Sequence, residues 1–343
     1  MDPAALPLSQ RLTTALAARA VSLSANPAGG LRLFNGYTEG LPDLVIDWMA
    51  GCAVIFNQAR QPEELAELLP EVTAWLRANL PGLASILLKT RHAPDLEARR
   101  GALLWGETIP VELVEAGVHH ALDLRINQDA SFYLDTRSLR AWLTEQASGK
   151  LVLNAFAYTG SLGTAALAGG AAQVDQTDRS LRFLQLAHRS CRLNGLNPDL
   201  MRLLAGDFFN ITARLRRERA LYDLILLDPP YFSESARGRV DLARNLPALI
   251  NKVRPLAAHQ GRLVVVNNAL FVSGQQFMAA LRSLCSDGYM QIETHLDIGD
   301  DITGCASLRA ASQPVNPAPF NHSTKIAVLR LSRKDQAAAR KPA

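Results

Sequence analysis

The fold is decided by Leu151-Val152-Leu153-Asn154-Ala155-Phe156-Ala157-Tyr158-Thr159-Gly160-Ser161-Leu162-Gly163. An apolar run with a β-branched residue stops at a small turn that contains glycine, and an alanine-rich pattern from Thr164 to Ala172 follows. This order is typical of a strand, a ligand-binding loop and a helix. We therefore expect the first strand and the nucleotide loop of a doubly wound α/β domain.

A second strand is predicted over residues 171–178, and it ends in an acid. Asp178 stands about 20 residues beyond the loop, where a carboxylate can accept both hydroxyls of a ribose. Asp175 is the competing candidate if the strand is shorter.

Two further strand ends carry polar residues. A helix is predicted from Leu181 to Leu193, and the third strand after it ends at Asp207, which could accept from an adenine amino group, with Phe208 beside it. Residues 222–231 are predicted to form a buried strand that ends in Asp228-Pro229-Pro230-Tyr231.

The sequence contains neither Gly-x-Gly-x-x-Gly nor Gly-x-x-x-x-Gly-Lys-Ser/Thr, the motifs that cradle phosphates. The four strand ends thus describe a site for an adenosine without a pyrophosphate, and they resemble the class I S-adenosylmethionine-dependent methyltransferases. The resemblance implies a Rossmann-like α/β domain that binds S-adenosyl-L-methionine. The implied cofactor contacts are Asn154, Phe156, Tyr158, Gly160, Ser161, Asp178, Arg179, Asp207, Phe208 and Asp228.

Two other stretches extend the resemblance. Residues 31–47 look like the central-domain signature of bacterial 23S rRNA methyltransferases, and residues 131–140 look like the entry to the catalytic domain of that family. The family contains cytosine-C5 and guanine-N7 enzymes, so it implies ribosomal RNA as the partner. Its layout implies an α+β domain over residues 25–118 and a methyltransferase domain over 119–334. From the sequence pattern we expect a helical extension over residues 1–24 and a disordered basic tail over 335–343.

Two departures from the cytosine-C5 branch bear on the chemistry. Only about 25 residues precede the central domain, whereas that branch begins with an RNA-binding PUA domain. The branch also carries a nucleophilic cysteine after the fifth strand, where this chain has residues 263–271 and no thiol. Carbon C5 of cytosine is not nucleophilic until a thiolate has added to C6, so the C5 route requires a positioned cysteine. Of the four cysteines, we expect Cys52, Cys191 and Cys285 to be packing residues, and Cys305 is the one candidate nucleophile in a loop.

The Asp-Pro-Pro-Tyr motif favours methylation of a nitrogen. In amino methyltransferases the carboxylate and the proline carbonyl accept the hydrogens of an exocyclic amine, while the aromatic ring stacks on the flipped base. The predicted catalytic residues are therefore Asp228, Pro229 and Tyr231. Residues proposed for the substrate side are Phe132, Asp135, Arg137, Arg140, Asn267, Asn268, Asn321 and His322.

Composition agrees with an enzyme of the cytoplasm that acts on a polyanion. The 343 residues carry a net charge of +4 and are 48% hydrophobic, enough for two cores. The four cysteines are not spaced as in a metal-binding motif, and no apolar run is long enough to cross a membrane. A homodimer is possible on this sequence. Arg214, Arg216, Arg217 and Arg219 form a basic cluster, either a solvated helix face or a phosphate contact. The alternatives kept are a cytosine-C5 enzyme that uses Cys305 and a methyltransferase for a protein or a small molecule.

Overall fold

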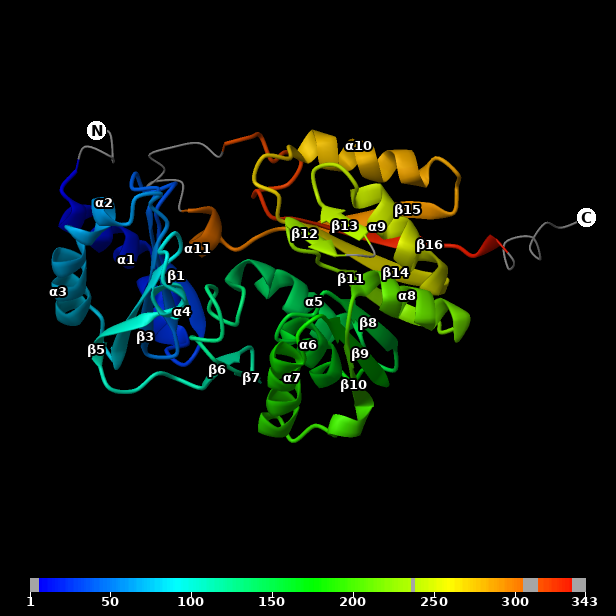
Figure 1. The fold of residues 1–343 in the computed structure, drawn as a ribbon, viewed down its shortest axis with the longest axis horizontal. Coiled ribbons are helices and arrows are strands. Elements are labelled where there is room, and N and C mark those ends of the chain that lie inside the picture. Colours follow the sequence, from blue (N-terminus) through cyan, green and yellow to red (C-terminus); the bar gives the residue numbers. More distant parts are fainter. Residues whose placement is uncertain (1–5, 236–237, 305–313, 335–343) are drawn as a thin grey trace, which may run out of the picture. The chain divides into compact units, whose positions relative to one another are not determined.

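The computed structural model describes residues 6–235, 238–304 and 314–334, and it divides the chain into two compact units (Figure 1). The first unit comprises Met1–Asp135 and Gly299–Gln313, and the second comprises Thr136–Ile298 and Pro314–Ala343. The first unit therefore extends beyond residue 118, where the sequence suggested a boundary. The tail expected over residues 335–343 lies outside the described residues.

The first unit is built on a five-stranded sheet. Its strands pair in chain order, antiparallel except for the parallel pair of the third and fourth strands. The strands are β1 (Gly30–Asn35), β2 (Leu44–Met49), β3 (Cys52–Asn57), β4 (Ser85–Thr90) and β5 (Ala102–Gly106).

Four helices belong to the N-terminal part of this unit. They are α1 (Leu8–Ala25), α2 (Glu63–Ala66), α3 (Leu69–Asn79) and α4 (Leu96–Arg100). Helix α1 turns one face inward, where Leu8, Leu12, Ala15 and Leu23 are buried. The spacing of apolar residues over 62–79 is typical of one continuous helix, but the structure forms two helices there, α2 and α3. The second begins with Pro70 in its first turn, where a proline is tolerated because that amide has no acceptor in the helix.

A hairpin explains why the first unit reaches Asp135. Strand β6 (Glu112–Glu115) pairs with β7 (Val118–Ala121), and the Val114 amide donates to the Ala28 carbonyl at 2.9 Å. Residues 121–126 alternate in a pattern typical of a strand, but the strand here is β7, which carries His119 and His120. The following alternation instead buries Leu122, Leu124 and Ile126 without forming a strand.

A short segment late in the chain completes the first unit. Helix α11 (Asp300–Thr303) packs against β1. The Arg32 amide donates to the Asp301 carboxylate at 3.1 Å, and Asn35 donates its side-chain amide to the Ile302 carbonyl. The buried Arg19 guanidinium donates to the Asp301 carbonyl at 3.1 Å and forms an ion pair with Glu39 at 2.6 Å. The chain thus leaves the second unit at Ile298 to supply these contacts and returns to it at Pro314.

The second unit contains a seven-stranded sheet of order β10-β9-β8-β11-β14-β16-β15. Its first five strands in this order are parallel, and the last two pair antiparallel. Their bounds are β8 (Leu151–Ala155), β9 (Gln173–Asp178), β10 (Met201–Ala205), β11 (Tyr222–Leu227), β14 (Ala257–Asn267), β15 (Met290–Leu296) and β16 (Lys325–Leu331). The predicted Rossmann-like α/β domain is confirmed. The strand order reverses between β8 and β11, and ligands of such sheets bind at the carboxyl ends of the strands beside this point.

Helices cover both faces of this sheet (Figure 1). Helices α5 and α7 both pack on α6, and α8 and α10 both pack on α9. Their bounds are α5 (Arg137–Gln146), α6 (Ser161–Ala168), α7 (Leu181–Leu193), α8 (Phe208–Arg217), α9 (Leu246–Val253) and α10 (Gly274–Cys285). A small hairpin of β12 (Phe232–Ser235) and β13 (Gly238–Asp241) follows β11. The core of the unit lies on β11 and β14, where Leu224, Ile225, Leu263 and Val264 are fully buried.

Candidate active site

The loop after β8 has an unusual backbone. Phe156 and Tyr158 adopt left-handed conformations with φ of 60° and 53°, and Gly160 follows with φ of 79°. Two non-glycine residues with positive φ in one short loop store strain, which is typical of ligand-binding turns. The Ala157 amide donates to the Thr177 carbonyl at 2.8 Å and holds the loop against the end of β9.

Hydrogen bonds that involve Asn154 and Gly160 anchor this loop. Asn154 is fully buried and donates to Gln176 Oε1 at 2.7 Å, and Gln176 Nε2 donates to the Gly160 carbonyl at 3.1 Å. A Cβ on Gly160 would come within 2.4 Å of Ala187 and 2.7 Å of Gln176, so only glycine fits here. Ser161 is the first residue of α6. Asn154 was predicted to touch the cofactor, but in the structure its side chain is buried and supports the loop through Gln176.

The two acids of β9 have different surroundings. Asp178 accepts from the amides of Tyr158 at 3.0 Å and Ser180 at 2.9 Å, one on each oxygen, and also from the Arg179 amide. A carboxylate has about four acceptor positions, so Asp178 can still accept from a ligand. Burial raises the pKa of Asp178, against the lowering by these amides. The competing candidate, Asp175, is fully buried and bonded to Arg202 and Tyr222. Only Asp178 is therefore arranged to receive a ligand.

The third strand leads to Asp207, which caps α8. Its Oδ1 accepts from the amides of Phe209 at 3.0 Å and Asn210 at 3.3 Å. No hydrogen bond to its Oδ2 is present among the described residues, so this oxygen can still accept from a ligand. Phe208 stacks on Phe156 with ring centroids 4.5 Å apart and an interplanar angle of 25°.

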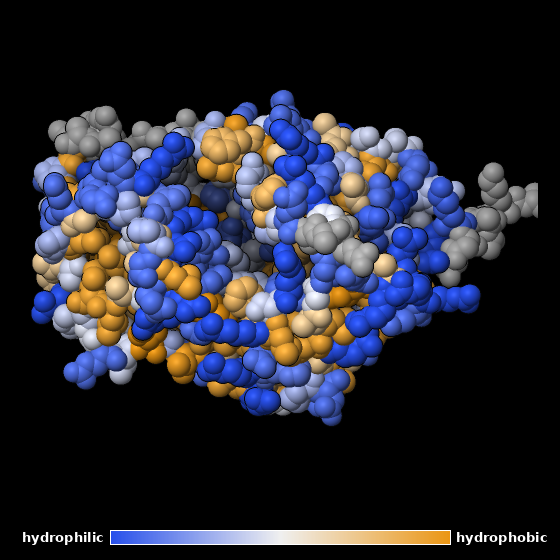
Figure 2. Space-filling model, in the orientation of Figure 1, coloured by the Kyte–Doolittle hydropathy of each residue, from blue (hydrophilic) through white to orange (hydrophobic). Residues whose placement is uncertain are grey.

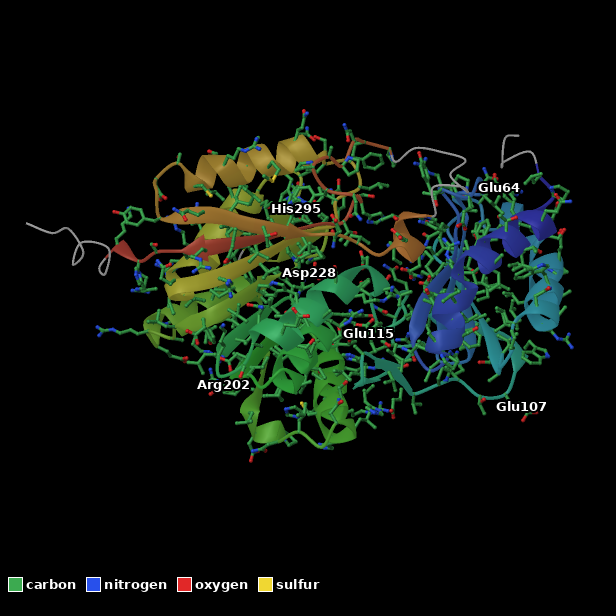
Figure 3. The ribbon with its side chains drawn as sticks, turned by 180° about the vertical axis from the view of Figure 1, so that it is seen from behind. Glu64, Glu107, Glu115, Arg202, Asp228 and His295 are labelled. Carbon is green, nitrogen blue, oxygen red and sulfur yellow. The ribbon has the colours of Figure 1, made fainter. Side chains whose placement is uncertain are left out.

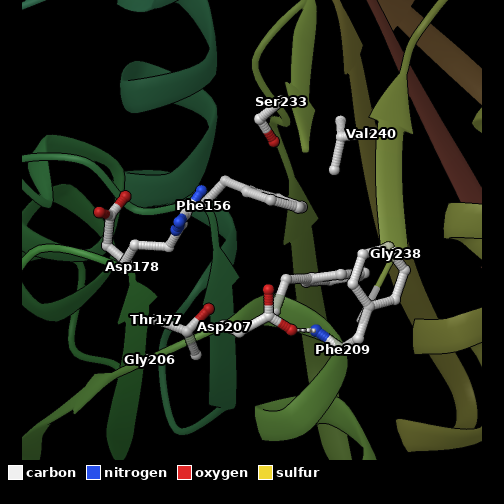
Figure 4. Close-up of a pocket in the computed structure, with 11 residues that line it drawn as sticks. Phe156, Thr177, Asp178, Gly206, Asp207, Phe209, Ser233, Gly238 and Val240 are labelled. Carbon is white, nitrogen blue, oxygen red and sulfur yellow. Dashed lines mark hydrogen bonds between the residues drawn. The ribbon is translucent and has the colours of Figure 1, made fainter. Parts of the chain in front are cut away.

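These side chains line a pocket within the second unit (Figure 4). It holds about 350 Å³ of empty space, including its open mouth. Five of the residues predicted to touch the cofactor line it: Phe156, Asp178, Arg179, Asp207 and Phe208. The sequence analysis missed Thr177, Gly206, Phe209, Ser233, Gly238 and Val240. The last three come from the β12–β13 hairpin, which the sequence did not lead us to expect.

The pocket fits the nucleoside part of S-adenosyl-L-methionine. Two carboxylates with free lone pairs suit ribose hydroxyls and an exocyclic amine, and the stacked pair of Phe156 and Phe208 offers an apolar wall for an adenine ring. Phosphates would be repelled by the same carboxylates. The donor set therefore agrees with an adenosine that lacks a pyrophosphate.

Asp228 follows β11, the strand next to β8 (Figure 3). It is partly buried, and its amide lies 3.5 Å from the Ala155 carbonyl of β8. The Pro229 carbonyl accepts from Asn268 Nδ2 at 3.5 Å, and Tyr231 is 50% exposed. The motif therefore presents an aromatic ring to solvent at the same sheet edge as the pocket residues.

The substrate-side candidates do not form one group. Asn267 is buried, with its side-chain oxygen accepting from the Ala269 amide at 3.0 Å, and its Nδ2 lacks a partner among the described residues. Asn321 donates to and accepts from the backbone of Ile298, and His322 Nδ1 accepts from the Thr324 amide. These three side chains are engaged in holding loops.

Of the other five candidates, Asn268 donates to the Pro229 carbonyl, and the remaining four are divided between the units. Phe132 is buried in the first unit against His120, with ring centroids 5.0 Å apart, and Asp135 is the last residue of its N-terminal part. Arg137 opens α5 of the second unit, where Arg140 is buried and donates to Thr136 Oγ1 at 2.7 Å.

A buried lysine lies behind this edge. Lys325 is fully buried, pairs with Asn267 across the strands, and donates to the carbonyls of Ala269, at 3.4 Å, and Ser323. Burial lowers the pKa of its ammonium to about 8. The residues directly before Lys325 are polar, so the local sequence does not indicate that this lysine is buried.

The described thiols are poor nucleophiles. Cys52 and Cys191 are fully buried, and burial raises the pKa of both, that of Cys191 to about 11. Burial also raises the pKa of the partly buried Cys285. Cys305, the candidate nucleophile, lies outside the described residues. The described residues contain no cluster of His, Cys, Asp and Glu suited to a metal ion and no helix that could span a membrane.

The basic cluster lies on an exposed helix face. Arg214, Arg216 and Arg217 are exposed in the last turn of α8, over which Figure 2 shows a hydrophilic surface. Arg214 lies 3.7 Å from Glu218 in a surface pair. The solvated face and the phosphate contact both remain compatible with this position.

Comparison with known proteins bears on the same residues. A family model described as S-adenosylmethionine-dependent methyltransferase matches residues 31–283. Ribosomal RNA large subunit methyltransferase I of Aeromonas salmonicida is 34% identical over 216 residues, which cover 60% of this chain and 52% of the relative. Ribosomal RNA large subunit methyltransferase of Deinococcus radiodurans is 30% identical over 285 residues, which cover 80% of this chain and 69% of the relative. The matched segment thus spans about half the length of the Aeromonas protein.

The fold has solved counterparts. The crystal structure of a methyltransferase complexed with SAH gives a TM-score of 0.82 at 20% identity, covering 94% of this chain and 80% of the other. Agreement over nearly the whole chain at this identity shows that the fold is shared.

Proposed function

The chain belongs to the S-adenosylmethionine-dependent methyltransferase family, and from this premise we propose that it methylates a base nitrogen in ribosomal RNA. The observation that carries the proposal is the Asp228-Pro229-Pro230-Tyr231 turn, which follows the strand next to the nucleotide loop and exposes its aromatic ring. The names of the relatives from Aeromonas and Deinococcus support an rRNA substrate.

Four residues would hold the cofactor. Asp178 would accept from the ribose hydroxyls, Asp207 Oδ2 from the adenine amine, and Phe156 and Phe208 would cover the ring. When bound, S-adenosyl-L-methionine supplies an electrophilic methyl group on a sulfonium.

Asp228 would hold the acceptor nitrogen. Its carboxylate and the Pro229 carbonyl would accept the two hydrogens of an exocyclic amine and turn the lone pair out of the ring system. Asn268 already donates to the Pro229 carbonyl, and that oxygen has a second lone pair for the substrate. The aromatic face of Tyr231 would stack on the extruded base. For a ring nitrogen such as guanine N7, the same groups would provide placement alone.

A cysteine route to cytosine C5 has less support. Residues 263–271, at the end of β14 and directly after it, contain no thiol, and burial raises the pKa of the three cysteines that the structure describes. RNA that carries 5-fluorocytosine would trap a protein that attacks C6 with a thiolate. We expect no covalent complex, and replacement of Cys305 by Ala should leave turnover within a few fold.

The direct test compares the modified nucleosides of ribosomal RNA from wild-type and deletion strains by mass spectrometry. We expect one methylated nucleoside to be lost and then restored when purified protein and S-adenosyl-L-methionine are added to the deletion-strain ribosomal RNA. An unchanged nucleoside profile would instead favour a protein or small-molecule substrate. A cytoplasmic site of action follows from an rRNA substrate, and the homodimer stays a prediction.

A further inference from the structure

Four large apolar side chains are exposed at the carboxyl edge of the second unit's sheet. Tyr231 and Phe232 are 50% and 48% exposed, and Leu270 and Phe271 are 43% and 68% exposed. The first two follow β11 and the last two follow β14, its parallel neighbour, with Leu227 opposite Val265 in the register. Both pairs therefore leave the sheet at the same edge. We name these four residues the apolar rim.

The loop that carries Phe271 is firmly anchored. The Ala269 amide donates to Asn267 Oδ1 at 3.0 Å, and the Ala269 carbonyl accepts from the Val272 amide at 3.2 Å and from Lys325 Nζ at 3.4 Å. After it, Ser273 and Gln276 form a reciprocal capping box at the start of α10. The exposed ring is thus held by a fixed backbone, which lowers the entropy cost of a contact made by it.

The protein core does not use Phe271. The apolar cluster beneath it contains the buried Phe277 and Phe320, whose ring centroids lie 5.4 Å apart, and Val272 packs against this cluster. Leu270 and Phe271 are not members of it. Figure 2 shows hydrophobic surface beside the start of α10, where this loop lies. Two adjacent large apolar side chains on a rigid loop at a binding edge indicate a contact surface.

The rim is joined to the catalytic motif and carries positive charge. Asn268, one residue after the end of β14, donates to the Pro229 carbonyl at 3.5 Å, so the two loops meet. The Arg239 guanidinium lies 4.8 Å from the ring centroid of Phe232, is about half exposed, and forms an ion pair with Asp241 at 3.3 Å through one of its nitrogens. Aromatic rings for bases beside a guanidinium for phosphates are what unpaired nucleic acid requires.

We propose that Phe271, with Leu270 beside it, forms a second stacking platform that holds an unpaired nucleotide next to the target base. The platform rests on the proposed function, because the target base is taken to enter at the Asp228 edge. A base needs an exposed π face to stack, so the platform selects unpaired RNA over a continuous duplex.

The test measures binding alone and does not depend on methylation. Fluorescence anisotropy of the full chain is recorded with a labelled, unstructured oligoribonucleotide and with a blunt RNA duplex of equal length. We expect the single strand to bind more tightly, and Phe271→Ala to weaken its binding about 5- to 150-fold. Phe271→Trp should bind within a few fold of wild type. Leu193→Ala, at a 41% exposed apolar position on α7 in the same unit, is the matched control and should change nothing.

A salt series sharpens the assignment. Stacking releases no counterions, so Phe271→Ala should lower affinity at every salt concentration without changing the slope of log K against log salt. Equal binding of Phe271→Ala and wild type, equal binding of duplex and single strand, or no binding by the wild type would each overturn the platform. An unchanged rRNA profile in the deletion strain, together with loss of binding in Phe271→Ala, would refute the rRNA substrate and leave the platform in place. Thermal unfolding of each variant checks that the fold is retained.

Discussion

In the second unit's sheet, Asp175 and Glu293 are paired with arginines, whereas Asp178 and Asp207 at the carboxyl edge accept from backbone amides. Near the amino ends, Asp175 is bonded to Arg202 and Tyr222, and Glu293 on the antiparallel β15 is bonded to Arg262 and Arg330. At the other edge, neither Asp178 nor Asp207 has an ion pair among the described residues. Figure 3 shows Arg202 and Asp228 well apart on this sheet.

The two acids of β9 show what this difference does. Burial raises the pKa of both, but the bonds from Arg202, Tyr222 and Gln173 outweigh it for Asp175 and hold that pKa below its ordinary value. The pKa of Asp178 remains raised, because backbone amides compensate burial less completely than a guanidinium does. A satisfied carboxylate stabilises the fold, and an undersatisfied one is available to a ligand.

Asp228→Ala should give the largest effect. If the carboxylate aligns the acceptor nitrogen, its loss should lower the single-turnover rate about 10²- to 10³-fold and leave cofactor affinity within a few fold. The control is Asp223→Ala at the other end of β11, where the carboxylate accepts from the Leu151 amide. Rate and affinity that fall together in Asp228→Ala would mean that Asp228 binds the cofactor instead.

Asp175→Asn should destabilise the fold without affecting the site. The change removes a buried charge that accepts hydrogen bonds from Arg202 on β10, Tyr222 on β11 and Gln173 on β9 itself, and we expect a loss of about 2–3 kcal/mol in the free energy of unfolding. Denaturant unfolding measures this loss. Calorimetry should find the cofactor affinity of the folded variant unchanged, and a weaker affinity would show that the two ends of β9 are coupled.

Asp178→Ala should show the opposite pattern. It removes the charge-assisted acceptor for the ribose and should weaken binding of S-adenosyl-L-methionine by about 1.5–3 kcal/mol. The free energy of unfolding without ligand should fall by less than in Asp175→Asn, because Asp178 has no ion pair among the described residues for the change to break. Calorimetric affinity equal to that of wild type would remove Asp178 from the cofactor site.

Two tyrosines, one at the start of β11 and one shortly after its end, show the same contrast between a buried structural side chain and an exposed one. Tyr222 is buried and donates to Asp175, whereas Tyr231 is half exposed. Tyr231→Ala should cost about 1–3 kcal/mol of base stacking and raise the apparent substrate constant with little change in stability. Tyr222→Phe, the paired variant, should reduce stability and spare the substrate constant.

The smallest effect concerns Glu293 and acid. Hydrogen bonds from Arg262 and Arg330 lower its pKa to about 2, against the effect of burial. A lowered folded pKa gives stability that is present above the ordinary value of 4.5 and is lost as pH falls toward 2. Glu293→Gln should therefore lose about 0.5–1 kcal/mol at pH 7, since the pair is partly exposed, and its unfolding free energy should fall less between pH 4.5 and 2. Parallel acid limbs in the two proteins would contradict this.

Local patterns determined how much of the fold could be predicted. The helix from Leu181 to Leu193 has the predicted bounds, because Ser180 caps its start and Asn194-Gly195 ends it. The strand ends that carry Asp178, Asp207 and Asp228 were found from apolar runs that stop at acids.

What the sequence could not supply were contacts between distant segments. Nothing local distinguishes Asp175 from Asp178 until Arg202 and Tyr222 are placed beside the former. The burial of Lys325 depends likewise on a register with Asn267 that only the folded sheet provides. The helix break at Pro70 and the β12–β13 hairpin depend on nearby residues, yet neither was predicted from the sequence.

The position of α11 in the first unit constrains the order in which the two units can finish folding. On a ribosome, residues 6–135 emerge first. Arg19 has Glu39 as a partner there, but its bond to the Asp301 carbonyl, and the bonds of the Arg32 amide and the Asn35 side chain to α11, form only after residues 301 and 302 have been made. By then β8 to β15 have already been translated. The first unit can therefore be completed only after most of the second unit has been translated, and a nascent chain arrested before residue 300 should remain sensitive to protease at α1 and β1.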